Sequence, residues 1–164
     1  MVGTQDTHIL LVDNGSYKPE SVLNLRNVAQ KVSEYSGLNV NPVSLLHSNK
    51  ISSEKINNVP AQVFEPYVTA KVNEGIKDFL ILPLFFGRSA AIYEYLPQRV
   101  TEIEKTCGKF NVKIAPPLVD LEDETNNDVA LVNKALESVL KNREIEYRVA
   151  SQSDGFNWIS VERR

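Results

Sequence analysis

The chain is poor in several features, and each shortage excludes a class of protein. Cys107 is its only cysteine in 164 residues, so no internal disulfide can form. No basic run accompanies the net charge of -3, which argues against a nucleic-acid partner. No apolar stretch reaches the roughly 18 residues of a membrane-spanning helix, so we expect no membrane partner. The first residues lack the basic segment of a signal peptide, and we therefore expect a cytoplasmic protein.

Short apolar runs alternate with helical patterns along most of the chain. The runs are rich in Ile, Leu and Val, as strands buried on both faces are, and cover residues 8–13, 39–46, 79–86 and 111–118. Apolar residues at helical spacing cover 20–37, 60–75, 90–108 and 126–142. This order predicts an α/β sandwich with a mainly parallel four-stranded sheet and helices on both faces.

The C-terminal residues follow a different pattern. Ile145, Tyr147 and Val149 alternate with polar residues before an Asp154-Gly155 turn signal, and Phe156 and Trp158 follow it. The pattern predicts a β-hairpin-like extension. We expect one α/β domain at residues 1–143, with the extension at 144–164 packed on it or on a partner chain.

A polar tetrapeptide, Asp13-Asn14-Gly15-Ser16, follows the first predicted strand. In an open α/β sheet, ligands usually bind at the carboxyl ends of the strands, where this tetrapeptide stands. Gly15 permits a turn or the close approach of a ligand, Ser16 can bond free helix N–H groups, and Pro19 suits a first helical turn. The residues alone are consistent with a helix start or with a ligand site. A dinucleotide fingerprint is excluded, because only one glycine is present.

Three further loops meet at the same predicted edge. The loop after the second predicted strand holds His47. The loop after the third holds the Gly87-Arg88-Ser89 turn, followed by Tyr93 and Glu94. The loop after the fourth holds acidic residues at 120–124. Imidazole and carboxylate groups from separate loops can converge on one divalent cation such as Co, Fe, Ni or Zn. A single histidine at a strand end is more often a hydrogen-bonded structural residue, and Glu94 is also consistent with a favourable place near a helix N-terminus.

Three segments in series resemble one protein family. "ILLVDNGSYKPES", "PVSLLHSNKISSEKI" and "DFLILPLFFGRSAAIYEYLPQRV" are similar to the small class II chelatases of the CbiX and SirB type, which are sirohydrochlorin cobalto- and ferrochelatases. The resemblance covers roughly residues 8–140. It implies a chelatase-like, flavodoxin-like three-layer sandwich that pairs as a homodimer. It also implies insertion of Co²⁺ or Fe²⁺, as a substrate, into sirohydrochlorin for cobalamin or siroheme biosynthesis, with no organic cofactor.

The resemblance assigns site residues, and the chain departs from the family pattern at three of these positions. Family members typically carry histidines where Asn14 and Ala91 stand, and a glutamate where His47 stands. Glu94 retains the chemical character of the family residue at its position. A neutral imidazole can hold a metal ion and accept a proton, but an amide cannot accept one. The resemblance therefore implies that His47 and Glu94 are the catalytic residues and the metal ligands.

The remaining site residues are assigned to the substrate. Sirohydrochlorin is a polycarboxylate, and arginine pairs well with carboxylates. The expected substrate-binding residues are Asn14, Gly15, Ser16, Arg88, Ser89 and Tyr93. Two alternatives remain open: a non-catalytic protein that binds a tetrapyrrole or a metal complex in the same cleft, and a flavodoxin-like nucleotide or flavin binder.

Overall fold

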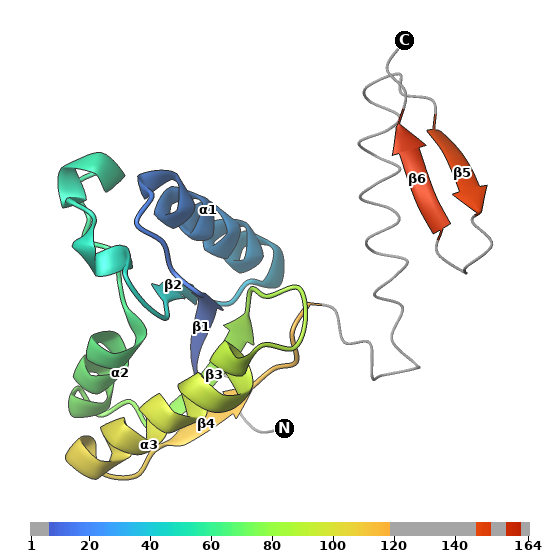
Figure 1. The fold of residues 1–164 in the computed structure, drawn as a ribbon. Helices are drawn as coiled ribbons and strands as arrows, with labels where there is room; N and C mark the ends of the chain where they lie inside the picture. The colour runs from blue at the N-terminus through green and yellow to red at the C-terminus, as the bar shows by residue number, and fades with distance from the viewer. Residues whose placement is uncertain (1–6, 119–146, 152–156, 162–164) are drawn as a thin grey trace. The chain divides into compact units, whose positions relative to one another are not determined.

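The computed structural model describes residues 7–118, 147–151 and 157–161 (Figure 1). The chain divides into two compact units, residues 1–120 and 121–164. The helix predicted at 126–142, the acidic residues at 120–124 and the Asp154-Gly155 turn lie outside the described residues.

The first unit is built on a four-stranded sheet in which all neighbouring strands are parallel. The strand order is β2-β1-β3-β4. The strands are β1 (His8–Asp13), β2 (Val40–Ser44), β3 (Asp78–Pro83) and β4 (Asn111–Ile114). Each strand lies within or within one residue of a predicted apolar run, so the predicted parallel sheet is confirmed.

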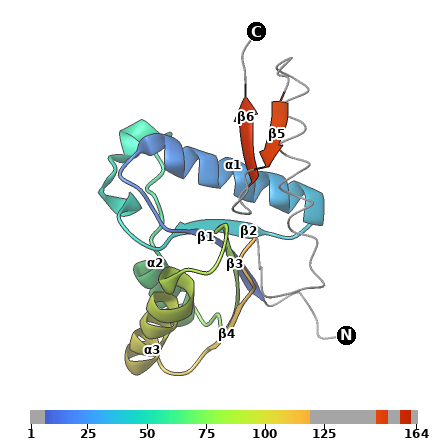
Figure 2. The ribbon, with the colours of Figure 1, turned by 45° about the vertical axis from the view of Figure 1, so that its right-hand side comes forward.

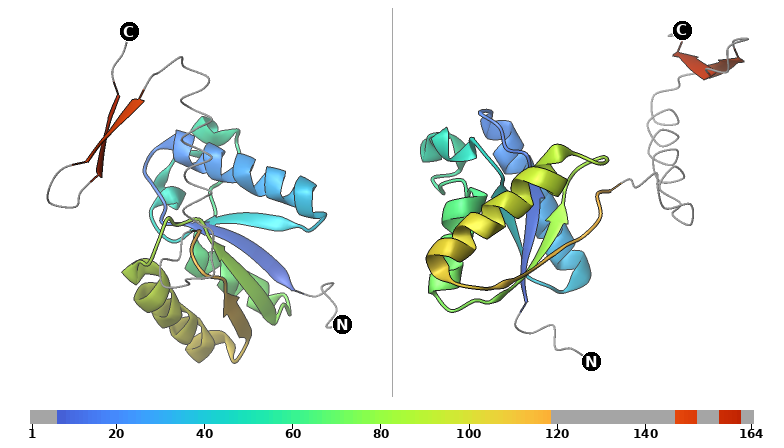
Figure 3. Two further views of the ribbon diagram at one scale, coloured as in Figure 1. Left: turned by 90° about the vertical axis from the view of Figure 1, so that its right-hand side faces the viewer. Right: turned by 60° about the horizontal axis from the view of Figure 1, so that its bottom comes forward.

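Helices cover both faces of this sheet. They are α1 (Pro19–Ser36), α2 (Phe64–Asn73) and α3 (Leu96–Cys107), with short 3₁₀ turns at Ser48–Lys50 and Ser53–Ile56. Figures 2 and 3 show α1 on one side of the strands and α2 and α3 on the other. In the described part of the chain, no helix is both long and apolar enough to cross a membrane.

Side chains that alternate between the two faces of each strand explain the three layers. In β1, Ile9 and Leu11 pack in the cluster that contains residues of α1, whereas Leu10 and Val12 pack in the cluster that contains residues of α2 and α3. Successive side chains of a strand point to opposite faces, so an unbroken apolar run fills two cores at once. The predicted three-layer α/β sandwich is confirmed.

The helix ends follow the predicted signals. Pro19 occupies the first position of α1, and Gly37 ends it in the left-handed conformation (φ 71°) with its N–H donated to the Ser33 carbonyl at 2.9 Å. Pro66 lies in the first turn of α2. Pro97 lies in the first turn of α3, directly after a π-helical turn at Ala91–Tyr95. Because proline lacks an N–H, it cannot make the regular hydrogen bond four residues back, and a widened turn accommodates this.

The second unit contains two described strands. β5 (Tyr147–Ser151) and β6 (Asn157–Val161) pair antiparallel, with Val149 opposite Ile159. The predicted hairpin-like strand pair is therefore confirmed. Its packing on the α/β domain or on a partner chain, and the domain boundary at residue 143, stay predictions.

Candidate functional site

Gly15 brings the loops after β1 and β2 into contact. Its φ is +89°, and a Cβ atom at this position would lie 1.8 Å from the carbonyl oxygen of Leu46. Two backbone hydrogen bonds join the same loops, from Leu45 N–H to the Asp13 carbonyl (2.8 Å) and from Leu46 N–H to the Asn14 carbonyl (3.3 Å). The close approach that Gly15 permits is thus to the chain's own backbone. Its role in substrate binding stays a prediction.

Buried serine hydroxyls hold these loops together. Ser48, which is 1% exposed, has its Oγ 2.9 Å from Ser44 Oγ and accepts a hydrogen bond from Ser16 N–H at 3.2 Å. Ser16 Oγ accepts from the N–H of Lys18, the residue before α1, at 3.0 Å. Ser16 therefore orders the approach to the helix rather than bonding N–H groups inside it. The network fixes the first loop on the second.

Asp13 ends β1 inside this network. Burial raises the pKa of its carboxyl group, although hydrogen bonds from Ser44 and from the Gly15 N–H (3.1 Å) oppose the rise. The Asp13 carboxyl group thus joins the start of the loop, at Gly15, to the end of β2, at Ser44. Sequence reasoning left Asp13 out of the site residues, and its signal was its place as the first member of the tetrapeptide.

His47 has an unusual backbone conformation. Its φ is 65° and its ψ is -33°, and the Ser48 N–H bonds the Leu46 carbonyl across it at 2.7 Å. This is a γ-turn with positive φ, which is rare and strained for a residue other than glycine. Strain of this kind persists only where the surrounding structure holds the residue in place, and such residues cluster at functional sites. The conformation singles out His47 among the residues of this edge.

Tyr17 holds the His47 side chain. The Tyr17 hydroxyl lies 2.9 Å from Nδ1 of His47, and the two rings stack with centroids 4.7 Å apart and planes at 24°. Tyr17 is 62% exposed. Sequence reasoning did not identify this tyrosine, since its partner lies 30 residues away.

The loop after β3 carries the other predicted residues. The Arg88 guanidinium carbon lies 4.7 Å from the centroid of the Tyr93 ring, a cation–π contact. Ser89 accepts at its Oγ from the Ala91 N–H (3.2 Å) and at its carbonyl from the Ile92 and Tyr93 N–H groups (3.0 and 3.1 Å). Arg88 and Tyr93 are thus brought together, and Ser89 starts the turn that carries Tyr93.

The predicted metal ligands are not joined directly. Within residues 7–118, His47 and Glu94 form neither an ion pair nor a hydrogen bond with each other, and Glu94 is exposed. Nor does any group of three or more His, Cys, Asp or Glu side chains suited to a metal ion occur in the described part of the chain. Asn14 is exposed as well. The assignment of His47 and Glu94 as metal ligands stays a prediction.

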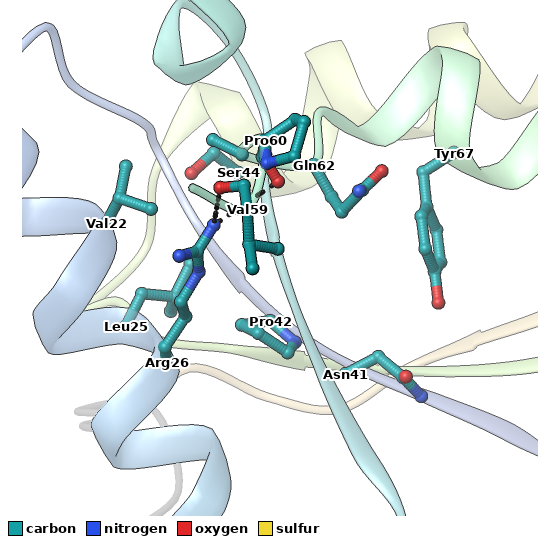
Figure 4. A pocket seen from close by; sticks show the side chains of 11 residues that line it. Val22, Leu25, Arg26, Asn41, Pro42, Ser44, Val59, Pro60, Gln62 and Tyr67 are labelled. Atoms are coloured by element: carbon teal, nitrogen blue, oxygen red, sulfur yellow. Dashed lines mark hydrogen bonds between the residues drawn. The ribbon is translucent and has the colours of Figure 1, made fainter. Parts of the chain in front are cut away.

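A pocket of about 170 Å³ lies elsewhere, along the outer side of β2 (Figure 4). It is bounded by α1, β2, the segment at residues 59–62 and Tyr67. Figure 4 shows the Arg26 side chain directed at the segment that contains Val59 and Pro60. None of the predicted site residues lines this pocket, so the two places are separate.

Comparison with known proteins identifies the family. The family model named CbiX matches residues 8–123, which is most of the chain. The chain belongs to the CbiX family. Comparison with curated proteins gives no match. CbiX-family membership makes the chain a member of the class II chelatases and agrees with the resemblance seen in its three loop motifs.

A solved structure supports the same fold for this CbiX-family chain. It is the crystal structure of a putative cobalamin (vitamin B12) biosynthesis CbiX protein from Marinobacter aquaeolei VT8. The TM-score is 0.59 at 16% sequence identity, with 83% of this chain and 98% of that chain covered. At this identity the likeness concerns the fold, and the chemistry must be argued from the residues at the site.

Proposed function

We propose that this CbiX-family protein inserts Co²⁺ or Fe²⁺ into sirohydrochlorin, in cobalamin or siroheme biosynthesis, at the carboxyl edge of its sheet. One observation carries the proposal: a strained γ-turn holds His47 at this edge, where the family has a carboxylate. The strained backbone of His47 is explained if its imidazole takes part in the chemistry.

The reaction makes three demands on the site. The metal ion must lose water, the macrocycle must bend, and two pyrrole N–H protons must leave. A neutral imidazole serves the first and the third, because it can bind a divalent ion and accept a proton. We assign this role to His47, with Glu94 as the second ligand or proton acceptor. Asn14 cannot replace the family histidine, because an amide accepts no proton.

Exposed aromatic rings at the same edge suit a flat macrocycle. Tyr17, Phe86 and Tyr93 follow strand ends and are 62%, 80% and 44% exposed. Aromatic faces stack on planar ligands. We further propose that Arg88 pairs with the carboxylates of the substrate.

The other substrate contacts belong to the first and third loops. We assign hydrogen bonds with the substrate to Asn14, Gly15, Ser16 and Ser89, which stand at the same edge. Following the family, we also propose a cytoplasmic homodimer that needs no organic cofactor.

A non-catalytic tetrapyrrole- or metal-binding protein is the second candidate. The observation that favours it is the lack, in residues 7–118, of a hydrogen bond or ion pair between His47 and Glu94. Such a protein would keep the aromatic rings and Arg88 but would bind without inserting metal.

The absorbance spectrum of sirohydrochlorin separates the two candidates. The tetrapyrrole is incubated anaerobically with Co²⁺ or Fe²⁺, with and without the protein. We expect insertion faster than the uncatalysed rate. A spectral shift on mixing, without faster insertion, would favour the binding protein, and an unchanged spectrum would remove sirohydrochlorin as the ligand.

A further inference from the structure

Tyr17 is the residue at this edge whose contacts have the clearest chemical consequence. It is largely exposed, so burial alone does not explain its orientation. Its hydroxyl lies 2.9 Å from Nδ1 of His47, and its ring stacks on the imidazole at 4.7 Å. Two contacts, one polar and one between ring faces, thus fix the position and the rotation of the imidazole.

The hydrogen bond engages one of the two ring nitrogens. A neutral imidazole carries a proton on one nitrogen and a lone pair on the other. Within the described residues, Nε2 of His47 makes no hydrogen bond, so Nε2 is the nitrogen available to a ligand. If Nδ1–H donates to the Tyr17 oxygen, Nε2 keeps its lone pair. If the hydroxyl donates to Nδ1, Nε2 carries the proton and cannot bind a metal.

Metal-binding histidines generally donate their second ring N–H to a carboxylate, a backbone carbonyl or water, which sets the tautomer and orients the ring. The Tyr17 hydroxyl occupies that place on His47. We propose that Tyr17 is a positioning residue that holds His47 as the Nδ1–H tautomer and leaves Nε2 free to bind a divalent cation. The inference rests on the proposed function for the binding of the cation by His47 and for its use in metal insertion, whereas the tautomer of His47 is tested independently of both.

The backbone supports the same arrangement. The γ-turn at His47 is held by the 2.7 Å bond across it, and the Gly15 backbone lies close to the Leu46 carbonyl. The strained turn therefore fixes the backbone position of His47, and Tyr17 determines which ring nitrogen is left for a ligand.

Tyr17→Phe removes the hydroxyl and keeps the ring that stacks. Tyr35→Phe is the matched control, because Tyr35 is 97% exposed on the same unit. The side-chain tautomer of His47 is read from the nitrogen chemical shifts of its ring in mildly alkaline buffer, where imidazole is neutral. The chain has two histidines, so His8→Gln assigns the signals.

We expect the Nδ1–H form in the natural protein and in Tyr35→Phe, and a shift toward the Nε2–H form in Tyr17→Phe. Binding of Co²⁺ alone is measured by the change in the His47 ring signals. We expect the affinity for Co²⁺ to fall about 10-fold or more in Tyr17→Phe and to stay unchanged in Tyr35→Phe. A dominant Nε2–H form in the natural protein would overturn the inference. So would Co²⁺ affinity that Tyr17→Phe leaves unchanged.

The proposed function is tested apart from this inference. If the natural protein holds the Nδ1–H form and binds Co²⁺ but does not insert it into sirohydrochlorin, the insertion reaction is wrong and the role of Tyr17 stands. If insertion is fast while Tyr17→Phe changes neither the tautomer nor Co²⁺ binding, the role of Tyr17 is wrong and the reaction stands.

Discussion

Two glycines of the first unit share a left-handed backbone but differ in their surroundings. Gly15 has a φ of +89° and faces the Leu46 carbonyl, whereas Gly37 has a φ of +71°, and an added Cβ there would meet no atom within 4 Å beyond its chain neighbours. The conformation itself costs an L-residue about 1–2 kcal/mol. At Gly15 a clash with backbone atoms adds to that cost.

Gly15→Ala is therefore expected to lower the free energy of unfolding far more than Gly37→Ala. We expect a loss of about 4 kcal/mol or failure to fold for Gly15→Ala, and a loss of about 1 kcal/mol for Gly37→Ala. Urea denaturation of both variants measures the difference. Equal losses would show that the two loops do not approach each other as described.

His8 begins β1 at the opposite edge of the sheet from the tetrapeptide. Its Nε2 lies 2.9 Å from the Tyr67 hydroxyl, and its ring packs against Tyr67 and Phe79. Burial, and then the charge of Lys71, hold the pKa of His8 below its ordinary value of 6.5, while Glu74 acts in the opposite direction. The folded protein therefore favours the neutral ring.

A lowered pKa in the folded state makes stability depend on pH. The stabilising contribution is complete above pH 6.5, the ordinary value, and is lost as the pH falls through the lower folded value, because the unfolded chain binds the proton more readily. His8→Gln keeps a hydrogen-bonding group near Tyr67 but does not titrate. Urea denaturation between about pH 7.5 and pH 5 is expected to show a smaller acid loss for His8→Gln. Parallel curves for the two proteins would exclude this role of His8.

At the scale of elements, the edge strand β2 is closed to further strands. Its outward N–H groups are already used, by the Gln62 carbonyl at Ser44 (3.0 Å) and by the Ser33 hydroxyl at Val40 (3.0 Å). Pro42, between them, has no N–H. A partner strand would find no free donor on this side of β2. We therefore expect a dimer to form without extending the sheet through β2.

Arg26 fastens the segment that covers this edge. From α1 it donates to the carbonyls of Ile56 and Val59, both at 2.7 Å, and of Pro60 at 3.2 Å. Arg26→Ala removes these charged hydrogen bonds, and we expect a loss of about 2 kcal/mol in the free energy of unfolding.

Lys31→Ala is the matched control for this helix, because Lys31 is exposed on α1. A surface substitution of this kind is expected to change stability by no more than about 0.5 kcal/mol. Thermal or urea unfolding compares the two variants. A loss for Arg26→Ala as small as that of the control would show that the segment does not depend on Arg26.

The sequence predicted the elements better than the contacts between loops. Strand and helix positions follow from local signals, such as the apolar run at residues 8–13 and Gly37 at the end of α1. The γ-turn at His47 and its contact with Tyr17 depend on residues that are distant in sequence. No local pattern encodes such a meeting, so sequence reasoning found His47 from its place after a predicted strand and from the family resemblance, and missed Tyr17.

At the scale of the whole molecule, the fold and the chemistry have separate support. The parallel sheet, its two covered faces and the CbiX family match establish what kind of domain this is. One fold serves many reactions, so the reaction must rest on the residues at the carboxyl edge. Among those residues, His47 combines a strained backbone, a held side chain and a nitrogen without a partner in residues 7–118.

The rate of Co²⁺ insertion into sirohydrochlorin by His47→Ala tests the central claim most directly. The comparison uses the natural protein and Lys50→Ala, whose exposed side chain belongs to the turn after His47. If His47 binds the ion or accepts a pyrrole proton, His47→Ala should lower the rate about 100-fold or more, while Lys50→Ala stays within about twofold of the natural protein. Insertion by His47→Ala at the rate of the natural protein would contradict the account.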